Sequence, residues 1–171
     1  MTAFVALVRA VNVAGTGKLP KEHLQEMGEE CGFGDVRTFI NSGNLLFTSV
    51  LPEEKVKQCL LARLETYFGR PAEAQVRSAE EMKAAVAGNP FADDKPSRVM
   101  AHFIDARPCK AMLDEARDVQ GERLALGKRL IYVSYGEGIG RSKLKLPAIK
   151  AGTARNMNSV TRIAELLAEM E

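Results

Sequence analysis

The chain has 171 residues, of which 46% are hydrophobic and 27% charged, and its formal net charge is +2. This length and hydrophobic content exclude a disordered chain and fit one compact domain or two small halves packed together. The low net charge excludes a generally basic nucleic-acid-binding chain. Eight basic residues against one acidic residue nevertheless lie between positions 127 and 162, which predicts an anion-binding face or a solvated surface.

The first 78 residues alternate between strand and helix patterns. A short apolar run at 3–9 predicts a buried strand, and a helix is expected from Pro20 to a stop at Gly32. Runs at 36–40 and 44–49 flank the turn sequence NSG and predict a hairpin. A second helix at 52–68 and a last strand at 72–77 follow. The order β-α-β-β-α-β predicts a ferredoxin-like half over residues 1–78.

Residues 79–97 are expected to form a short helix and a linker, because Ser78 and Glu81 make a capping box and GNPFADDKPS is rich in turn residues. Beyond them the patterns predict a strand at 98–105, a helix at 108–117, a hairpin at 123–135, a helix at 141–150 and a C-terminal helix. The predicted fold class is therefore α+β with two ferredoxin-like (βαββαβ) halves. The second half, residues 98–171, is degenerate, lacks a closing strand and shows no residue-level repeat of the first.

The topology of the first half brings two of its loops to one end. The loop after the first strand and the turn of the hairpin both lie there, so their polar side chains are expected to converge. The predicted ligand-binding residues of this rim are Arg9, Asn12, Ser42 and Asn44. The glycine-rich AGTGKLP in the first loop does not fit G-x-x-x-x-G-K-[ST], which excludes a phosphate loop of the nucleoside triphosphatase type.

A second polar set lies in the basic stretch. Glycines precede a basic segment, and Arg155 and Asn156 precede a helix that Asn158 or Ser159 suffices to cap. Arginine holds phosphate or carboxylate in a fork, and asparagine orients a ligand through paired donor and acceptor. The predicted ligand-binding residues here are Arg141, Ser142, Lys143, Arg155 and Asn156. In the alternative interpretation, Arg155 and Asn156 fasten the two halves together.

The chain offers little protein-built chemistry. His23 and His102 stand without clustered carboxylates or cysteines, so neither a metal site nor a Ser-His-Asp arrangement is predicted, and no cofactor or catalytic residue is assigned. Cys31 and Cys59 fall on helical apolar stripes and are expected to be buried thiols. Without a recognisable signal segment or membrane-length apolar run, we expect a reduced, cytoplasmic protein with no membrane partner.

Five blocks of the sequence resemble the DUF1697 family, in the same order and across nearly the whole chain. They are ALVRAVNVAGTGKLPKEHL, CGFGDVRTFINSGNLLFTS, NPF, GRSKL and GTARNMNSVTRI. The resemblance implies a small α/β protein with ferredoxin-like halves and no established activity. Ala10 and Ala14 stand where glycine is usual in this family, and Met157 stands where tryptophan is usual.

The leading functional hypothesis is binding of a small anionic ligand that carries phosphate or carboxylate. One alternative is a nucleic-acid or protein interaction module that uses the basic C-terminal region. Another is an enzyme that depends on an external cofactor or on a phosphate of its substrate. The sequence leaves open whether the two polar sets form one cleft, and it does not set the oligomeric state.

Overall fold

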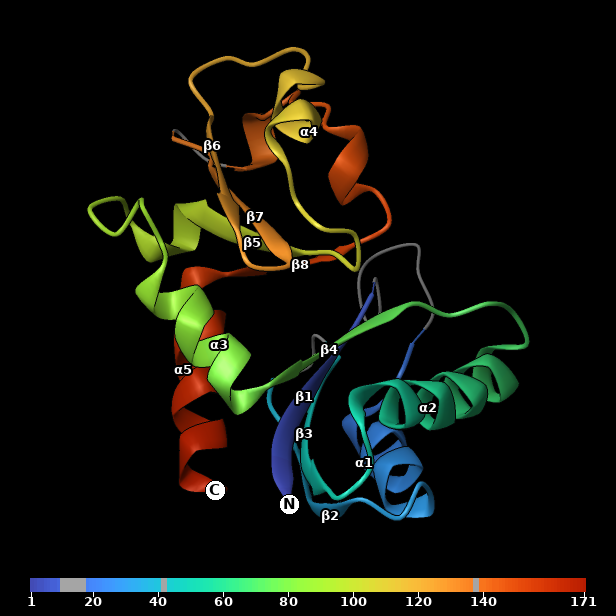
Figure 1. Ribbon diagram of the computed structural model, residues 1–171. Helices are drawn as coiled ribbons and strands as arrows, with labels where there is room; N and C mark the ends of the chain where they lie inside the picture. The colour runs from blue at the N-terminus through green and yellow to red at the C-terminus, as the bar shows by residue number, and fades with distance from the viewer. Residues whose placement is uncertain (10–17, 41–42, 137–138) are drawn as a thin grey trace. The chain divides into compact units, whose positions relative to one another are not determined.

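The computed structural model describes residues 1–9, 18–40, 43–136 and 139–171. The chain forms two compact units: the first unit comprises residues 1–80 and 163–171, and the second unit comprises residues 81–162. The described part is mixed α+β, with two four-stranded antiparallel sheets and five α-helices (Figure 1). Most of the segment predicted to be a helix and linker, 79–97, thus belongs to the second unit.

The first unit contains six of these elements. They are β1 (Thr2–Val8), α1 (Lys21–Glu30), β2 (Gly34–Thr38), β3 (Asn44–Ser49), α2 (Glu53–Phe68) and β4 (Ala74–Ser78). The strand order in the sheet is β2-β3-β1-β4, and each neighbouring pair is antiparallel. All six predicted elements are confirmed, with ends shifted by a few residues: the helices bury their periodic apolar stripes, whereas β1 and β3 are continuous buried runs.

Both helices of this unit begin after proline and bury the stripes that the sequence predicts. Helix α1 buries Leu24 and Met27, and α2 buries Val56, Leu60 and Leu64. These side chains form one apolar cluster with the sheet residues Phe4, Ala6, Val8, Leu45, Phe47 and Val76. Helix α2 ends because Gly69 adopts the left-handed conformation, with a φ of 67°, that glycine adopts without strain.

The cysteines of the first unit correct one prediction. Cys31, directly after α1, and Cys59, within α2, are joined in a disulfide with a Cα–Cα distance of 6.0 Å, and both are half-buried. The prediction of buried free thiols was wrong, because a separation of 28 residues gives no pairing signal and the contact exists only once the helices pack. Cys109 is a free, exposed thiol.

The second unit repeats the sheet arrangement. It contains α3 (Ala79–Ala87), whose first two residues belong to the first unit, and then β5 (Val99–Phe103), α4 (Lys110–Asp114), β6 (Arg123–Gly127), β7 (Leu130–Ser134) and β8 (Thr153–Asn156). Helix α5 (Met157–Glu169) follows and re-enters the first unit at Ile163. The strand order is β6-β7-β5-β8, and the predicted hairpin is confirmed as β6 and β7.

The segment predicted to be a helix at 141–150 forms no α-helix, and it is extended around Lys145 and Leu146. Leu144 and Leu146 pack in the apolar cluster of the second unit, and Lys145 between them pairs with Arg117 in an antiparallel bridge. Apolar residues two apart are the period of a strand, and the helical prediction missed this period. Only a short 3₁₀ turn follows, at Pro147–Ile149.

Strand β8 closes the second sheet, where the sequence predicted no closing strand. Thr153 and Arg155 are buried, whereas Ala154 and Asn156 are half-buried. The strand was missed because its buried side chains are polar, so the alternation of burial is not an alternation of hydrophobicity.

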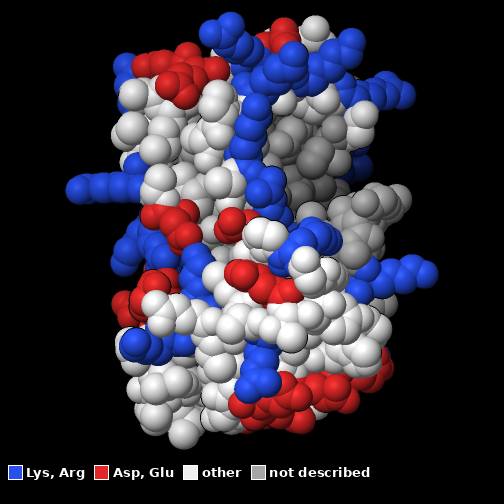
Figure 2. All heavy atoms as spheres, turned by 90° about the vertical axis from the view of Figure 1, so that its right-hand side faces the viewer, with Lys and Arg blue, Asp and Glu red and all other residues white. Residues whose placement is uncertain are grey.

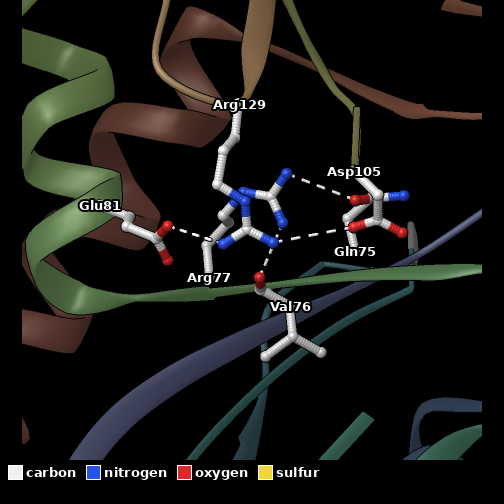
Figure 3. Close-up of polar contacts among 6 residues, drawn as sticks. All are labelled: Gln75, Val76, Arg77, Glu81, Asp105 and Arg129. Carbon is white, nitrogen blue, oxygen red and sulfur yellow. Dashed lines mark hydrogen bonds and ion pairs between the residues drawn. The ribbon is translucent and has the colours of Figure 1, made fainter. Parts of the chain in front are cut away.

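The two units share one residue-level feature, although the sequence predicts no residue-level repeat. In the first unit, Arg77 on the edge strand β4 pairs with Val5 of β1 and is buried. Its guanidinium donates to the carbonyl oxygen of Val76 at 2.8 Å and to Oε1 of Gln75 at 3.3 Å (Figure 3). The side chain thus turns back on the two residues that precede it.

Arg155 repeats this arrangement in the second unit. It lies on the edge strand β8, pairs with Ala101 of β5 and is buried. Its guanidinium donates to the carbonyl oxygen of Ala154 and to the hydroxyl of Thr153, both at 2.9 Å. A helix begins two residues after the arginine in both units. A buried arginine thus occupies the equivalent edge-strand position in the two sheets.

Candidate ligand-binding site

A polar pocket of about 650 Å³ lies within the second unit. Its walls come from the chain before β5, the residues just before β6, the end of β7 and the segment that follows β7. The lining residues are Asp94, Lys95, Arg98, Gln120, Gly121, Glu122, Ser134, Tyr135, Gly136, Arg141 and Ser142. A volume of this size suits a small ligand.

Three cationic side chains line the pocket. Arg98 ends the 3₁₀ turn Pro96–Arg98, Lys95 precedes it, and Arg141 ends a second turn at Ile139–Arg141. None of the three side chains makes a hydrogen bond or ion pair with another residue in the described part of the chain. In Figure 2, Lys and Arg side chains gather over the upper part of the drawn face.

The carboxylate of Asp94 is held by donors at the edge of the pocket. Its Oδ2 accepts a hydrogen bond from the hydroxyl of Ser134 at 2.6 Å and another from the guanidinium of Arg123. These two hydrogen bonds, that of Ser134 first, lower the pKa of Asp94 below its ordinary value. Arg123 also lies over the ring of Phe91, 4.7 Å from its centroid. Asp94 is therefore ionised and oriented at neutral pH.

Glu122 is a second oriented carboxylate in the pocket wall. Its side chain accepts hydrogen bonds from the backbone N–H of Gln120 and, at 2.8 Å, from the hydroxyl of Ser142. The backbone donor first, and then Ser142, lower the pKa of Glu122. Ser142 in turn accepts from the backbone N–H of Leu144 at 3.2 Å. Because Glu122 is also buried, it is a fixed acceptor.

Tyr135 links the pocket wall to a buried histidine. Its Oη lies 3.0 Å from Nε2 of His102. Burial, and then the charge of Glu122, raise the pKa of Tyr135 to about 12, and burial lowers the pKa of His102 to about 4. Both groups are neutral around pH 7. Since a general acid or base works best with a pKa near the operating pH, this pair is suited to hydrogen bonding rather than to proton transfer.

The structure brings two of the predicted second-half residues into this pocket, Arg141 and Ser142. Lys143 is exposed and is not among the lining residues. Arg155 is buried on β8, and burial lowers its pKa to about 10. Asn156 ends β8, and its Oδ1 accepts a hydrogen bond from the backbone N–H of Ser159 at 2.9 Å. Asn156, rather than Asn158 or Ser159, thus caps α5.

The predicted rim of the first unit is described in part. Arg9 is exposed, and its backbone N–H donates to the carbonyl of Glu73 at 2.9 Å. Asn44 is buried at the start of β3, and its Nδ2 donates to the carbonyl of Phe39 at 3.0 Å. Asn12 and Ser42 lie outside the described residues. The rim remains a prediction.

Several pocket residues were missed in the sequence. The segment that supplies Asp94, Lys95 and Arg98 was interpreted as a linker, and Glu122 and Tyr135 were not singled out. The charged residues around Pro96 were the one signal that could have pointed to this site. The hydrogen bonds of Asp94 with Ser134 and of Glu122 with Ser142 join residues 40 and 20 positions apart, so local sequence patterns do not show them.

Among the described residues, no group of three or more histidine, cysteine, aspartate or glutamate side chains is placed to hold a metal ion. The described helices include none that is long and apolar enough to cross a membrane.

Comparisons with known proteins agree with this fold. The sequence profile of a family described as a protein of unknown function, DUF1697, matches residues 1–132. Among solved structures, the conserved bacterial protein SP0830 from Streptococcus pneumoniae is 26% identical, with a TM-score of 0.74, over 97% of this chain and 98% of that chain. A search of curated proteins gives no match.

Proposed function

The chain belongs to the DUF1697 family, which brings no activity with it, and we propose that the pocket of the second unit binds a small ligand carrying phosphate or carboxylate. The observation that carries this proposal is an asymmetry among the charged groups of the wall. Asp94 and Glu122 already accept hydrogen bonds from neighbouring donors, whereas Lys95, Arg98 and Arg141 have no side-chain partner among the described residues.

Guanidinium and ammonium groups that face a shared concavity attract an anion strongly, because low-dielectric walls weaken the screening by water. Ser134 and Ser142 hold their hydroxyl protons toward Asp94 and Glu122. The cations are therefore the charged donors left for the ligand, and the side-chain amide of Gln120, which also lines the pocket, is a neutral donor beside them.

Two observations weigh against the alternative functions. A nucleic-acid module that uses its basic region needs an extended positive face, whereas the cations lining this pocket surround a concavity and share its wall with two carboxylates. An enzyme that depends on an external cofactor or on substrate phosphate still needs a group of its own to move protons near its working pH, but Tyr135 and His102 both stay neutral there.

We also infer that each unit is a ferredoxin-like half and that the family resemblance extends to this architecture. The matching strand orders, β2-β3-β1-β4 and β6-β7-β5-β8, support this inference, as do the equivalent arginines Arg77 and Arg155. In the second unit the extended segment around Leu144 takes the place of the second helix. The cytoplasmic location is retained as a proposal.

The test is isothermal titration of the whole protein with inorganic phosphate and with citrate, at low and at physiological salt. We expect saturable binding that Arg98→Gln and Arg141→Gln each weaken by about tenfold, the usual effect of losing one charge-assisted hydrogen bond. Lys128→Gln is the matched control, since Lys128 is exposed in the same unit and does not line the pocket. Equal weakening by all three variants indicates diffuse surface attraction and contradicts the proposal.

A further inference from the structure

The charge balance of the pocket specifies more than an anion. Lys95, Arg98 and Arg141 in the wall, with Arg123 on Asp94, give four cations against the two carboxylates of Asp94 and Glu122. Among the residues that the structure describes, the excess is two positive charges. A phosphate monoester carries about −1.5 to −2 near pH 7, whereas an amino-acid zwitterion carries none. The balance therefore favours a ligand with about two negative charges, such as a phosphate monoester, over a zwitterion.

The two carboxylates specify hydroxyl groups in the same ligand. An ionised carboxylate accepts at about four lone-pair positions and donates nothing. Asp94 accepts its two hydrogen bonds through Oδ2, which leaves Oδ1 without a donor among the described residues. Glu122 accepts one hydrogen bond from a side chain and one from a backbone N–H. Both therefore retain acceptor capacity at the pocket wall, which hydroxyl groups can use.

The composition of the wall disfavours an aromatic base. Tyr135 contributes the one aromatic ring, and no aliphatic side chain appears among the lining residues that the structure describes. A nucleobase buries its faces against apolar or aromatic side chains, and this wall offers a single such surface. A ligand that is polar along its whole length matches the wall better.

On these grounds, and resting on the proposed anion site, we propose that the pocket binds a sugar phosphate. Its phosphate lies among Lys95, Arg98 and Arg141, and its hydroxyl groups donate to Asp94 and Glu122.

Titration of the unmodified protein with four probes tests this assignment without any variant. The probes are glucose 6-phosphate, inorganic phosphate, glucose and adenosine monophosphate. We expect glucose 6-phosphate to bind at least about tenfold more tightly than inorganic phosphate, because charge-assisted hydrogen bonds to the carboxylates are added. Glucose alone should bind too weakly to measure, and adenosine monophosphate should not exceed glucose 6-phosphate.

A variant pair then assigns the hydroxyl contacts. Glu122→Gln and Asp94→Asn keep the shape of each side chain and remove its charge, so each should narrow the ratio between glucose 6-phosphate and phosphate affinities by several-fold. The Lys128→Gln control should leave that ratio unchanged. A melting curve for each variant shows whether it is folded. If a variant does not fold, the comparison of the four probes on the unmodified protein still tests the proposal.

The two proposals fail in different ways. If phosphate and glucose 6-phosphate bind equally, or if adenosine monophosphate binds best, the sugar-phosphate assignment is overturned while the anion site stands. If a free amino acid such as glutamate binds more tightly than any phosphate, the charge argument is wrong. If no anion binds, the proposed function itself fails.

Discussion

Replacement of Asn156 by alanine separates a structural role from a ligand-binding role. Oδ1 of Asn156 accepts the backbone N–H of Ser159 at 2.9 Å, which is the contact between an N-cap side chain and the third helical residue. Loss of this acceptor leaves a donor at the start of α5 unsatisfied by the protein. Such a loss costs about 1 kcal/mol of unfolding free energy, which corresponds to a fall of roughly 2–4 °C in Tm for a chain of this size.

The assay is thermal and urea unfolding followed by circular dichroism, together with a phosphate titration. Asn158→Ala is the matched control: Asn158 is exposed inside α5, where alanine is the better helix former, so its Tm should stay or rise slightly. Asn156→Asp should retain the cap, because a carboxylate accepts the same hydrogen bond. The reasoning is refuted if Asn158→Ala lowers Tm as much as Asn156→Ala, or if Asn156→Ala weakens phosphate binding without changing Tm.

Three further predictions concern the second unit. Burial lowers the pKa of His102 to about 4 in the folded protein, whereas the unfolded chain has a pKa of about 6.5 for this group. As pH falls, the unfolded chain therefore binds the proton first, and this difference should remove about 2 kcal/mol of stability between pH 7 and pH 5. Urea unfolding of His102→Gln should show a flatter dependence of stability on pH, and an unchanged dependence contradicts the assignment. A Cβ atom at Gly152 would lie 2.3 Å from a backbone carbonyl oxygen of β5, so Gly152→Ala should lower stability by about 3 kcal/mol or prevent folding. Gly140→Ala should be close to neutral in the same melting experiment, because no atom of the described residues lies within 4 Å of the added carbon. The hydroxyl of Tyr132 donates to the carbonyl of Ala85 at 2.6 Å in a buried setting, so Tyr132→Phe should cost about 1–2 kcal/mol, and an unchanged unfolding free energy would show that this hydrogen bond adds nothing.

The elements that the sequence predicts well are those whose side chains bury in an apolar pattern. The spacing of apolar residues identifies the face that helix α2 buries. Strand β1 was found instead from an uninterrupted apolar run, because it is buried on both faces. Strand β8 was missed because threonine and arginine occupy its buried positions. The prediction of a helix around Leu144 was wrong, because Leu144 and Leu146 are two positions apart, which is the spacing of a strand.

The pocket could be predicted only in part, since its residues meet through the fold. Arg141 and Ser142 were found because they sit in a conspicuous basic segment. Glu122 was not, because its role depends on the hydroxyl of Ser142, 20 residues further along the chain. The disulfide between Cys31 and Cys59 is a similar case, where packing of two helices creates a pair that spacing does not show.

The central claim is that the pocket of the second unit binds an anion, and a phosphate titration followed by amide NMR tests it most directly. The account predicts saturable shifts for the backbone amides of the pocket wall, among them Gly121, Gly136 and Ser142, with the signals of β1 and β3 unchanged. Saturable shifts confined to the first unit, around Arg9 and Asn44, would contradict the account and favour the rim that the sequence predicts. The absence of any saturable shift would contradict both.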